Sequence, residues 1–175
     1  MDDREPGASA VPLLAGLPTT AHNYESRCFP HRAPDTRMKR KHFEVRSAWN
    51  ARFFRSDRPW AAIQISSGAD HPELNDENRV GLVRLVFEDT WEAETDGSFN
   101  AGLAQEVLEF VEAMWNRVEL FLIHCEVGMS RSPAVAAALS RIHYNDDGRW
   151  FEMYFPNPLV YRLLLDVATR ASRQP

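Results

Sequence analysis

Hydrophobic residues along the chain fall into short uninterrupted runs and into longer stretches with helical spacing. Three short runs are apolar and rich in β-branched or aromatic residues, which is typical of buried strands: residues 60–66, 82–87 and 119–124. The stretch 100–115 instead places Leu103, Val107 and Val111 on one face, with glutamates elsewhere, and so predicts an amphipathic helix. Strands and helices are therefore expected to alternate.

Two further helices are predicted after the third strand. Ser132 and Pro133 are residue types of a helix N-cap and first turn, and an alanine-rich segment up to Ile142 follows them. Asn157 and Pro158 open a last segment whose apolar residues share one face. This alternation predicts an α/β domain with a central, mostly parallel sheet flanked by helices, and in such sheets ligands bind at the carboxyl ends of the strands.

The first 37 residues differ from the rest because they show neither a helical nor a strand period. They mix Pro, Ala, Thr, Arg and acidic residues, so we expect a flexible N-terminal tail over 1–37 and one folded domain over 38–175. A length of 175 residues with 44% hydrophobic content fits one such domain rather than two.

Composition and charge narrow the class of protein. No apolar run approaches the ~18 to 20 residues that a membrane span needs, and the start of the chain lacks the order of a secretory signal, so we expect a cytoplasmic protein. Cys28 and Cys125 cannot build a disulfide framework, and neither has a paired zinc-ligand spacing. The net charge of −5 argues against nucleic acid as a partner, although the stretch 37–58 is locally basic and could attract an anion.

One loop carries the candidate chemistry. Cys125 and Arg131 stand six positions apart, with Gly128 between them, a predicted strand before them and a predicted helix after them. Such a loop forms a concave backbone with inward-pointing N–H groups, and the helix start adds partial positive charge. We therefore expect it to bind a phosphate group, gripped bidentately by Arg131. The predicted phosphate-binding residues are Cys125, Glu126, Val127, Gly128, Met129, Ser130 and Arg131.

The same electrostatic field acts on the cysteine. A helix N-terminus and a neighbouring cation lower the pKa of a thiol far enough to leave a thiolate at cellular pH. Cys125 is therefore a candidate nucleophile in the same pocket as the phosphate. A buried structural thiol is the alternative role for a lone cysteine.

The loop and its neighbours match the pattern His-Cys-x2-Gly-x2-Arg-Ser. The matching residues are His124, Cys125, Gly128, Arg131 and Ser132. In this the chain resembles the cysteine-dependent protein tyrosine phosphatases, specifically their dual-specificity-like branch. The likeness extends upstream to Phe87–Thr90, and Tyr154–Asn157 is similar to a segment of bacterial and phage members. In all, the resemblance covers about residues 60–167.

The resemblance implies a protein tyrosine phosphatase-like catalytic domain and a two-step phosphoryl transfer. Cys125 attacks phosphorus to give phosphocysteine, and water then releases phosphate. Arg131 and the loop amides hold the phosphate oxygens in the transition state, and Ser132 hydrogen-bonds the sulfur. His124, just outside the pocket, orients the loop and tunes Cys125. The family needs no metal, and we expect neither a metal nor a cofactor.

A general acid must protonate the leaving group. We expect Asp89 in this role, because it follows the predicted strand 82–87 and resembles the strand-end Asp of the family. Four carboxylates on the same acidic stretch are rivals: Glu88, Glu92, Glu94 and Asp96. Asp96 is the next choice.

The predicted function is hydrolysis of a phosphomonoester through a phosphocysteine intermediate, by a phosphatase of the protein tyrosine or dual-specificity type. Its partner is expected to be a phosphorylated protein or a small phosphorylated substrate. Two alternatives stay open: a non-protein substrate such as an inositol phosphate, a phospholipid headgroup or an RNA 5′ phosphate, and a phosphate-binding module with weak turnover. The sequence does not determine the oligomeric state.

Two sets of side chains near the loop carry further expectations. Glu126 and Met129 are expected to point outward and to influence substrate preference. Four aromatic residues are expected in the core rather than at the pocket wall: Trp49, Phe53, Phe54 and Trp60.

Overall fold

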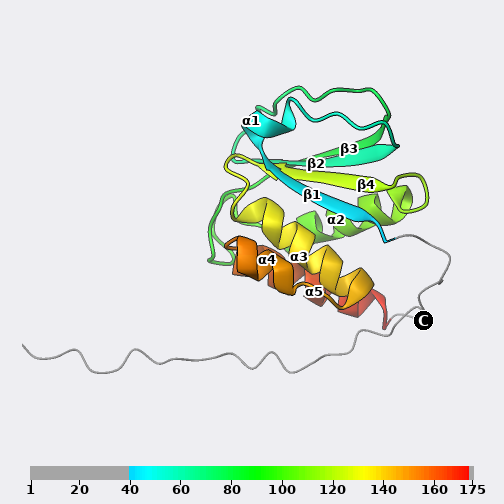
Figure 1. The fold of residues 1–175 in the computed structure, drawn as a ribbon. Helices are drawn as coiled ribbons and strands as arrows, with labels where there is room; N and C mark the ends of the chain where they lie inside the picture. The colour runs from blue at the N-terminus through cyan, green and yellow to red at the C-terminus, as the bar shows by residue number, and fades with distance from the viewer. Residues whose placement is uncertain (1–39, 174–175) are drawn as a thin grey trace, which may run out of the picture.

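In the computed structural model, residues 40–173 are described, and they form a four-stranded sheet and five helices (Figure 1). The strands are β1 (His42–Ser47), β2 (Trp60–Ser66), β3 (Arg79–Val86) and β4 (Leu120–Cys125). The helices are α1 (Ala48–Ala51), α2 (Ala101–Met114), α3 (Arg131–Tyr144), α4 (Gly148–Met153) and α5 (Pro158–Ala171). The predicted tail over 1–37, including Cys28, lies outside the described residues.

Every strand pairing within residues 40–173 is parallel, and the strand order is β1-β4-β2-β3. Ile123 of β4 aligns with Val45 on one side and with Ile63 on the other, and Ile63 aligns with Val83 of the far edge strand. Because all four strands run the same way, their carboxyl ends meet at one edge of the sheet. The prediction of an α/β domain with a parallel sheet is confirmed.

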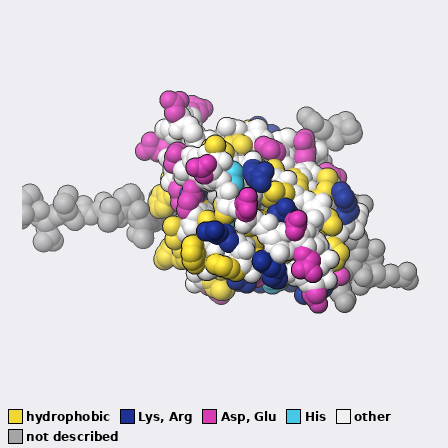
Figure 2. Space-filling view, turned by 90° about the horizontal axis from the view of Figure 1, so that it is seen from above, with side chains coloured by type: hydrophobic (Ala, Val, Ile, Leu, Met, Phe, Trp, Pro, Cys, Tyr) yellow, Lys and Arg dark blue, Asp and Glu magenta, His cyan; other side chains and the backbone are white. Residues whose placement is uncertain are grey.

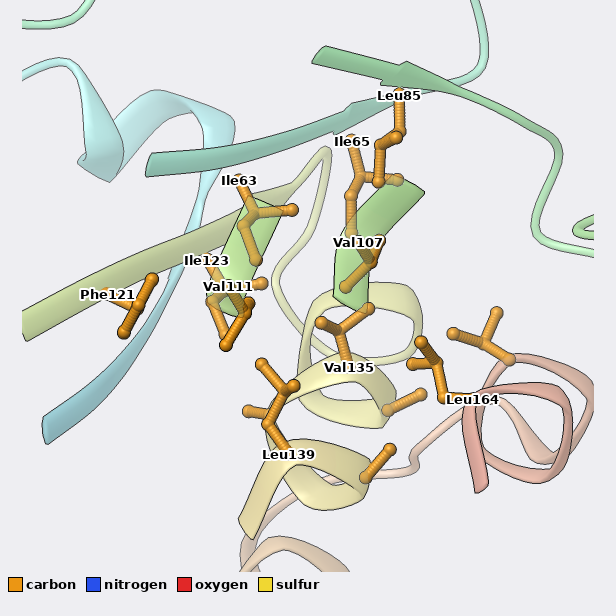
Figure 3. Close-up of a cluster of buried hydrophobic side chains, with 14 of the residues drawn as sticks. Ile63, Ile65, Leu85, Val107, Val111, Phe121, Ile123, Val135, Leu139 and Leu164 are labelled. Carbon is orange, nitrogen blue, oxygen red and sulfur yellow. The ribbon is translucent and has the colours of Figure 1, made fainter. Parts of the chain in front are cut away.

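Helices α2, α3, α4 and α5 cover one face of the sheet, and the main core lies between them and the strands (Figure 1). Ile63 and Ile65 of β2 point into this core, where Val107 of α2 and Val135 of α3 lie (Figure 3). The predicted amphipathic character of α2 therefore reflects its packing on the sheet.

The opposite face of the sheet has a smaller core beneath α1 and the connecting segments. It contains Trp60 and Ala62, which alternate along β2 with the residues of the main core, together with Phe54. Leu74, in the connection between β2 and β3, packs against this cluster. Burial on both faces explains why β2 and β4 read as continuous apolar runs rather than as alternating patterns.

Three elements were not predicted from the sequence: β1, α1 and α4. β1 alternates apolar and charged residues, and only Phe43 in it is fully buried, because it forms one edge of the sheet. Its charged residues lie in the basic stretch 37–58, and they mask the strand pattern in the sequence. α1 and α4 have four and six residues, too few to show a hydrophobic period.

Two local predictions are wrong. α3 begins at Arg131, so Ser130 rather than Ser132 occupies the N-cap position. Trp49 and Phe53 are each 64% exposed, because they lie in and just after the short α1 on the outer surface, whereas Phe54 and Trp60 belong to the core as expected.

Candidate active site

The phosphate loop, residues 125–131, joins the buried strand β4 to the start of α3 at the carboxyl edge of the sheet. Gly128 has a φ of +80°, a conformation that favours glycine. A Cβ on Gly128 would lie 2.7 Å from backbone atoms of Arg46 and Ser47, at the end of β1. The Ala48 amide donates to the carbonyl of Glu126 at 3.2 Å. The loop is therefore packed tightly against the neighbouring strand end, and only glycine fits at position 128.

Two hydrogen-bond donors converge on the Cys125 sulfur, which is buried within this loop. The Gly128 amide lies 3.3 Å from Sγ, and the Ser132 hydroxyl lies 3.2 Å from it. Both donors stabilise negative charge on sulfur. The bond from Ser132 places its hydroxyl where the sequence predicted it, at the thiol rather than at the helix cap.

The guanidinium of Arg131 is buried beside the loop, with a side chain only 6% exposed. Its Nη1 donates to Ser67 Oγ at 2.9 Å and to the Phe87 carbonyl at 2.7 Å, and its Nη2 donates to the Glu126 carboxylate. Its Nε has no hydrogen-bond partner among residues 40–173. A fixed cation with a free, buried N–H is suited to bind an anion.

Asp89 lies beside Arg131, on the acid loop that we define as residues 88–97. Its Oδ1 accepts hydrogen bonds from Ser130 Oγ and from Asn157 Nδ2, both at 2.8 Å. Its Oδ2 lies 3.9 Å from the Nε of Arg131. One carboxylate oxygen is thus held by the chain, while the other faces the guanidinium.

The rival carboxylates of the acid loop lie elsewhere. Within the described chain, no hydrogen bond or ion pair joins the side chains of Glu88, Glu92, Glu94 or Asp96 to the phosphate loop, and all four residues are exposed. The Glu88 amide donates to the Gly97 carbonyl at 2.8 Å, which closes the acid loop at its base. Only Asp89, among the five candidates, is brought to the phosphate loop.

Asn157 is the site residue that sequence reasoning missed. It is fully buried, and its Nδ2 donates to Asp89 and also to the Thr90 carbonyl at 3.0 Å. Its Oδ1 caps α5 through the Leu159 and Val160 amides. Its own amide donates to the Ser130 carbonyl at 3.1 Å. The Asn-Pro pair indicated a helix start, but nothing in the local sequence indicated that the free side of the same amide would hold the acid loop.

His124 is completely buried and lies on the opposite face of β4 from Cys125, since neighbouring strand residues point to opposite faces. Its Nε2 lies 3.1 Å from Gln64 Nε2, so the ring accepts at this nitrogen. Burial, and next the nearby His71, lower the pKa of His124 to about 4. The imidazole is therefore neutral at cellular pH and places no full charge beside Cys125.

The remaining loop residues face different ways. Val127 is 71% exposed, and Met129 is half-buried with its carbonyl accepting from the Phe155 amide at 3.0 Å. Glu126 does not simply point outward as expected, because its carboxylate contacts Arg131 and Ser67. The sequence could not show this, since the contact depends on the segment that follows β2.

No group of three or more His, Cys, Asp or Glu side chains within residues 40–173 is arranged to hold a metal ion. In the same part of the chain, none of the helices combines the length and the apolar character required to cross a membrane.

Several proteins of known structure have a similar fold. The crystal structure of human DUSP28 matches with a TM-score of 0.51 and 19% identity, over 76% of this chain and 95% of that one. The chain has the fold of the dual-specificity phosphatases. Human tyrosine phosphatase-like serine/threonine/tyrosine-interacting protein (TM-score 0.48, 17% identity, 65% and 78% covered) and PTPMT1 in complex with PI(5)P (0.46, 15%, 64% and 78%) are less similar. No family model and no curated sequence matches the chain.

The fold assignment rests on DUSP28, and at this level of identity it extends to the fold alone. The predicted dual-specificity-phosphatase-like architecture is therefore confirmed, whereas the narrower likeness to bacterial and phage members stays a prediction.

Proposed function

We propose that the chain is a cysteine-dependent phosphomonoester hydrolase of the protein tyrosine or dual-specificity type. The observation that carries the proposal is the arrangement of three groups at one loop. The Cys125 sulfur accepts from two donors, the buried Arg131 guanidinium keeps a free N–H, and Asp89 has an oxygen 3.9 Å from that nitrogen. Together they provide a nucleophile, an anion site and an acid.

In the first step the substrate phosphate lies against the loop amides and Arg131, in line with the sulfur. A bond forms between the Cys125 sulfur and phosphorus, and the bond from phosphorus to the ester oxygen breaks. Asp89 donates its proton to that oxygen, so the alcohol leaves neutral. The guanidinium and the amides stabilise the charge spread over the three remaining oxygens.

In the second step water attacks the phosphocysteine. Asp89, now a carboxylate, takes a proton from this water, the sulfur–phosphorus bond breaks, and inorganic phosphate leaves. The donors from Gly128 and Ser132 stabilise the departing thiolate. No metal or cofactor takes part in either step.

The two oxygens of Asp89 suit separate tasks. Ser130 and Asn157 both donate to Oδ1, which fixes the side chain. Oδ2 accepts from neither of them and lies on the Arg131 side. We assign the transferred proton to Oδ2. Asn157 and Ser130 are positioning residues in this scheme, because they act through Asp89.

A phosphoprotein is the substrate class that the surroundings of the loop favour. Three large apolar side chains stand exposed around it: Val127 in the loop, Trp91 in the acid loop and Phe155 (71%, 68% and 78% exposed). Such a rim suits an aromatic or apolar peptide segment beside the phosphate. Acidic side chains lie on both sides of the face seen from above (Figure 2). They include a group on the left, the side to which the strands run in Figure 1, and this disfavours a nucleic acid at the site.

The test is hydrolysis of an aryl phosphate by the purified protein in the presence of a chelator. We expect turnover that vanadate inhibits, and Cys125→Ser should lower kcat on the order of 10⁴-fold or more. Activity that survives in Cys125→Ser would contradict the cysteine mechanism. A panel of phosphotyrosyl and phosphoseryl peptides, inositol phosphates, phospholipids and RNA 5′ phosphates then defines the substrate, and preference for a non-protein member would overturn the phosphoprotein assignment.

A further inference from the structure

Glu126, the residue directly after the nucleophile, forms a bridge across the mouth of the site. Its Oε1 accepts from the Ser67 amide at 2.7 Å, and its Oε2 accepts from Nη2 of Arg131. Partial burial raises the pKa of Glu126, but hydrogen bonds from the amides of Ser67 and of Glu126 itself, together with the charge of Arg131, outweigh this and leave the pKa below its ordinary value. Glu126 is therefore a carboxylate at cellular pH.

The Glu126 carboxylate leaves some of the N–H donors of the Arg131 guanidinium free. A guanidinium has five N–H donors in a fixed plane. Both hydrogens of Nη1 are used, by Ser67 Oγ and the Phe87 carbonyl, and one hydrogen of Nη2 is used by Glu126. The Nε hydrogen and the second Nη2 hydrogen remain. These two point the same way from one edge of the plane, the arrangement that grips two oxygens of a phosphate.

Glu126 occupies a different edge of the guanidinium. Glu126 and Ser67 are hydrogen-bonded to each other, and they contact Nη2 and Nη1 respectively. Because the Glu126 carboxylate and the Ser67 hydroxyl are neighbours and bind different terminal nitrogens, they lie at the terminal edge of the guanidinium, between Nη1 and Nη2. The Nε atom is buried and without a partner in residues 40–173, with Asp89 Oδ2 3.9 Å away. The side edge of Arg131 is thus the one directed toward the acid.

We propose that Glu126 is a positioning residue: with Ser67 it holds the terminal edge of the Arg131 guanidinium and so presents the Nε–Nη2 edge to the phosphate of the substrate. This inference rests on the proposed function, because it assumes that the loop binds phosphate. A carboxylate in this place has an opposite potential role, which is to compete with phosphate for Arg131. The two roles predict opposite effects of removing the carboxylate on anion binding. Vanadate inhibition becomes weaker if Glu126 positions Arg131, and it becomes tighter if Glu126 competes with the anion.

The experiment measures vanadate inhibition and the kcat and KM for an aryl phosphate in Glu126→Ala. Loss of a charge-assisted hydrogen bond to the guanidinium should weaken vanadate inhibition and lower kcat/KM by about 10- to 100-fold. Glu126→Gln retains one acceptor oxygen, so it should recover part of this loss despite having no charge. Tighter or unchanged vanadate inhibition in Glu126→Ala would overturn the proposal in favour of competition.

Three controls make the result specific. Glu73→Ala removes one exposed carboxylate from the connection between β2 and β3. Glu73 has no hydrogen bond or ion pair with another residue of 40–173, so this variant should leave both constants unchanged. Thermal unfolding identifies any loss that is due to misfolding. Ser67→Ala removes an acceptor from the same edge, so its effect combined with Glu126→Ala should be smaller than the product of the single effects.

A readout without turnover separates this inference from the proposed function. With ¹⁵N-labelled arginine, the Arg131 Nε–H resonance should be sharp in the wild type and broadened in Glu126→Ala, because the guanidinium loses an anchor. If the wild type fails to hydrolyse the aryl phosphate but the resonance changes in this way, the proposed function fails, while the contact by which Glu126 holds the guanidinium is still supported. If the wild type is active and neither the resonance nor kcat/KM changes in the variant, the positioning role is wrong.

Discussion

The two loops that meet at the site are held in different ways. The phosphate loop connects a fully buried strand directly to a helix, and its shape depends on a glycine packed against β1. The acid loop is almost entirely exposed, and Asp89 reaches the site through contacts with Ser130 and Asn157, which are 41 and 68 residues away in the chain. In the proposed function, most of the anion site therefore belongs to one continuous segment, whereas proton transfer depends on the docking of three distant segments. Variants can separate these two properties.

Among the variants that compare the two loops, the largest expected effect comes from the acid loop. Asp89→Asn should lower kcat by about 10²- to 10⁴-fold and remove the alkaline limb of the kcat profile against pH, where the acid loses its proton. Vanadate should still bind, since Arg131 and the loop amides are unchanged. Asp96→Asn is the matched control and should remain close to wild type. A reversed pattern, with Asp96→Asn inactive, would assign the acid to Asp96.

The phosphate loop should respond to Gly128→Ala with a loss of both stability and anion binding. The added Cβ meets backbone atoms 2.7 Å away and the residue has a positive φ, so the free energy of unfolding should fall by about 3 kcal/mol. Gly68→Ala is the control, because a Cβ there meets nothing within 4 Å. Urea unfolding and vanadate inhibition measure the two effects. A Gly128→Ala protein as stable as wild type would show that the loop adapts more readily than its packing suggests.

The junction between the two loops is tested by Asn157→Ala. The variant loses the α5 cap and two buried donors, so the free energy of unfolding should fall by about 2 to 3 kcal/mol, with a loss of kcat. Asn157→Ser keeps a capping side chain but cannot reach Asp89. Relative to Asn157→Ala, Asn157→Ser should therefore regain more of the free energy of unfolding than of kcat. Equal recovery of both would mean that Asn157 acts only through the helix.

A smaller effect, on the pH dependence of stability, is expected from His124 in β4, the strand that leads into the phosphate loop. Because the pKa of His124 is lowered to about 4 in the folded protein, the unfolded chain binds a proton there between pH 6.5 and about 4 that the folded chain does not. Stability is therefore complete above this window and falls as the pH drops, by about 2 kcal/mol between pH 7 and pH 5. Urea unfolding of wild type and His124→Asn at both pH values measures it. Identical pH dependence in the two proteins would contradict the buried, neutral imidazole.

Predictions from sequence succeeded where the relevant contacts are local. The strands at 60–66 and 119–124 and the helix that begins near Asn100 coincide with β2, β4 and α2. Burial on two faces gives a strand a continuous apolar run, and burial of one stripe gives a helix its hydrophobic period, so both can be recognised in the sequence. β1 was missed because an edge strand with alternating charges resembles a loop in a single sequence.

The candidate site shows the same difference between local contacts, which could be predicted, and contacts between distant segments, which could not. Cys125, Gly128, Arg131 and Ser132 are close in the chain, so their spacing, together with the strand before them and the helix after them, predicts a loop that can hold an anion beside a thiol. The contacts that bring Asp89 to the phosphate loop, the use of Asn157 as a link and the contact of Glu126 with Arg131 were decided by the tertiary structure. Each depends on where separate segments end at the carboxyl edge of the sheet, and side-chain chemistry within one segment carries no information about that distance.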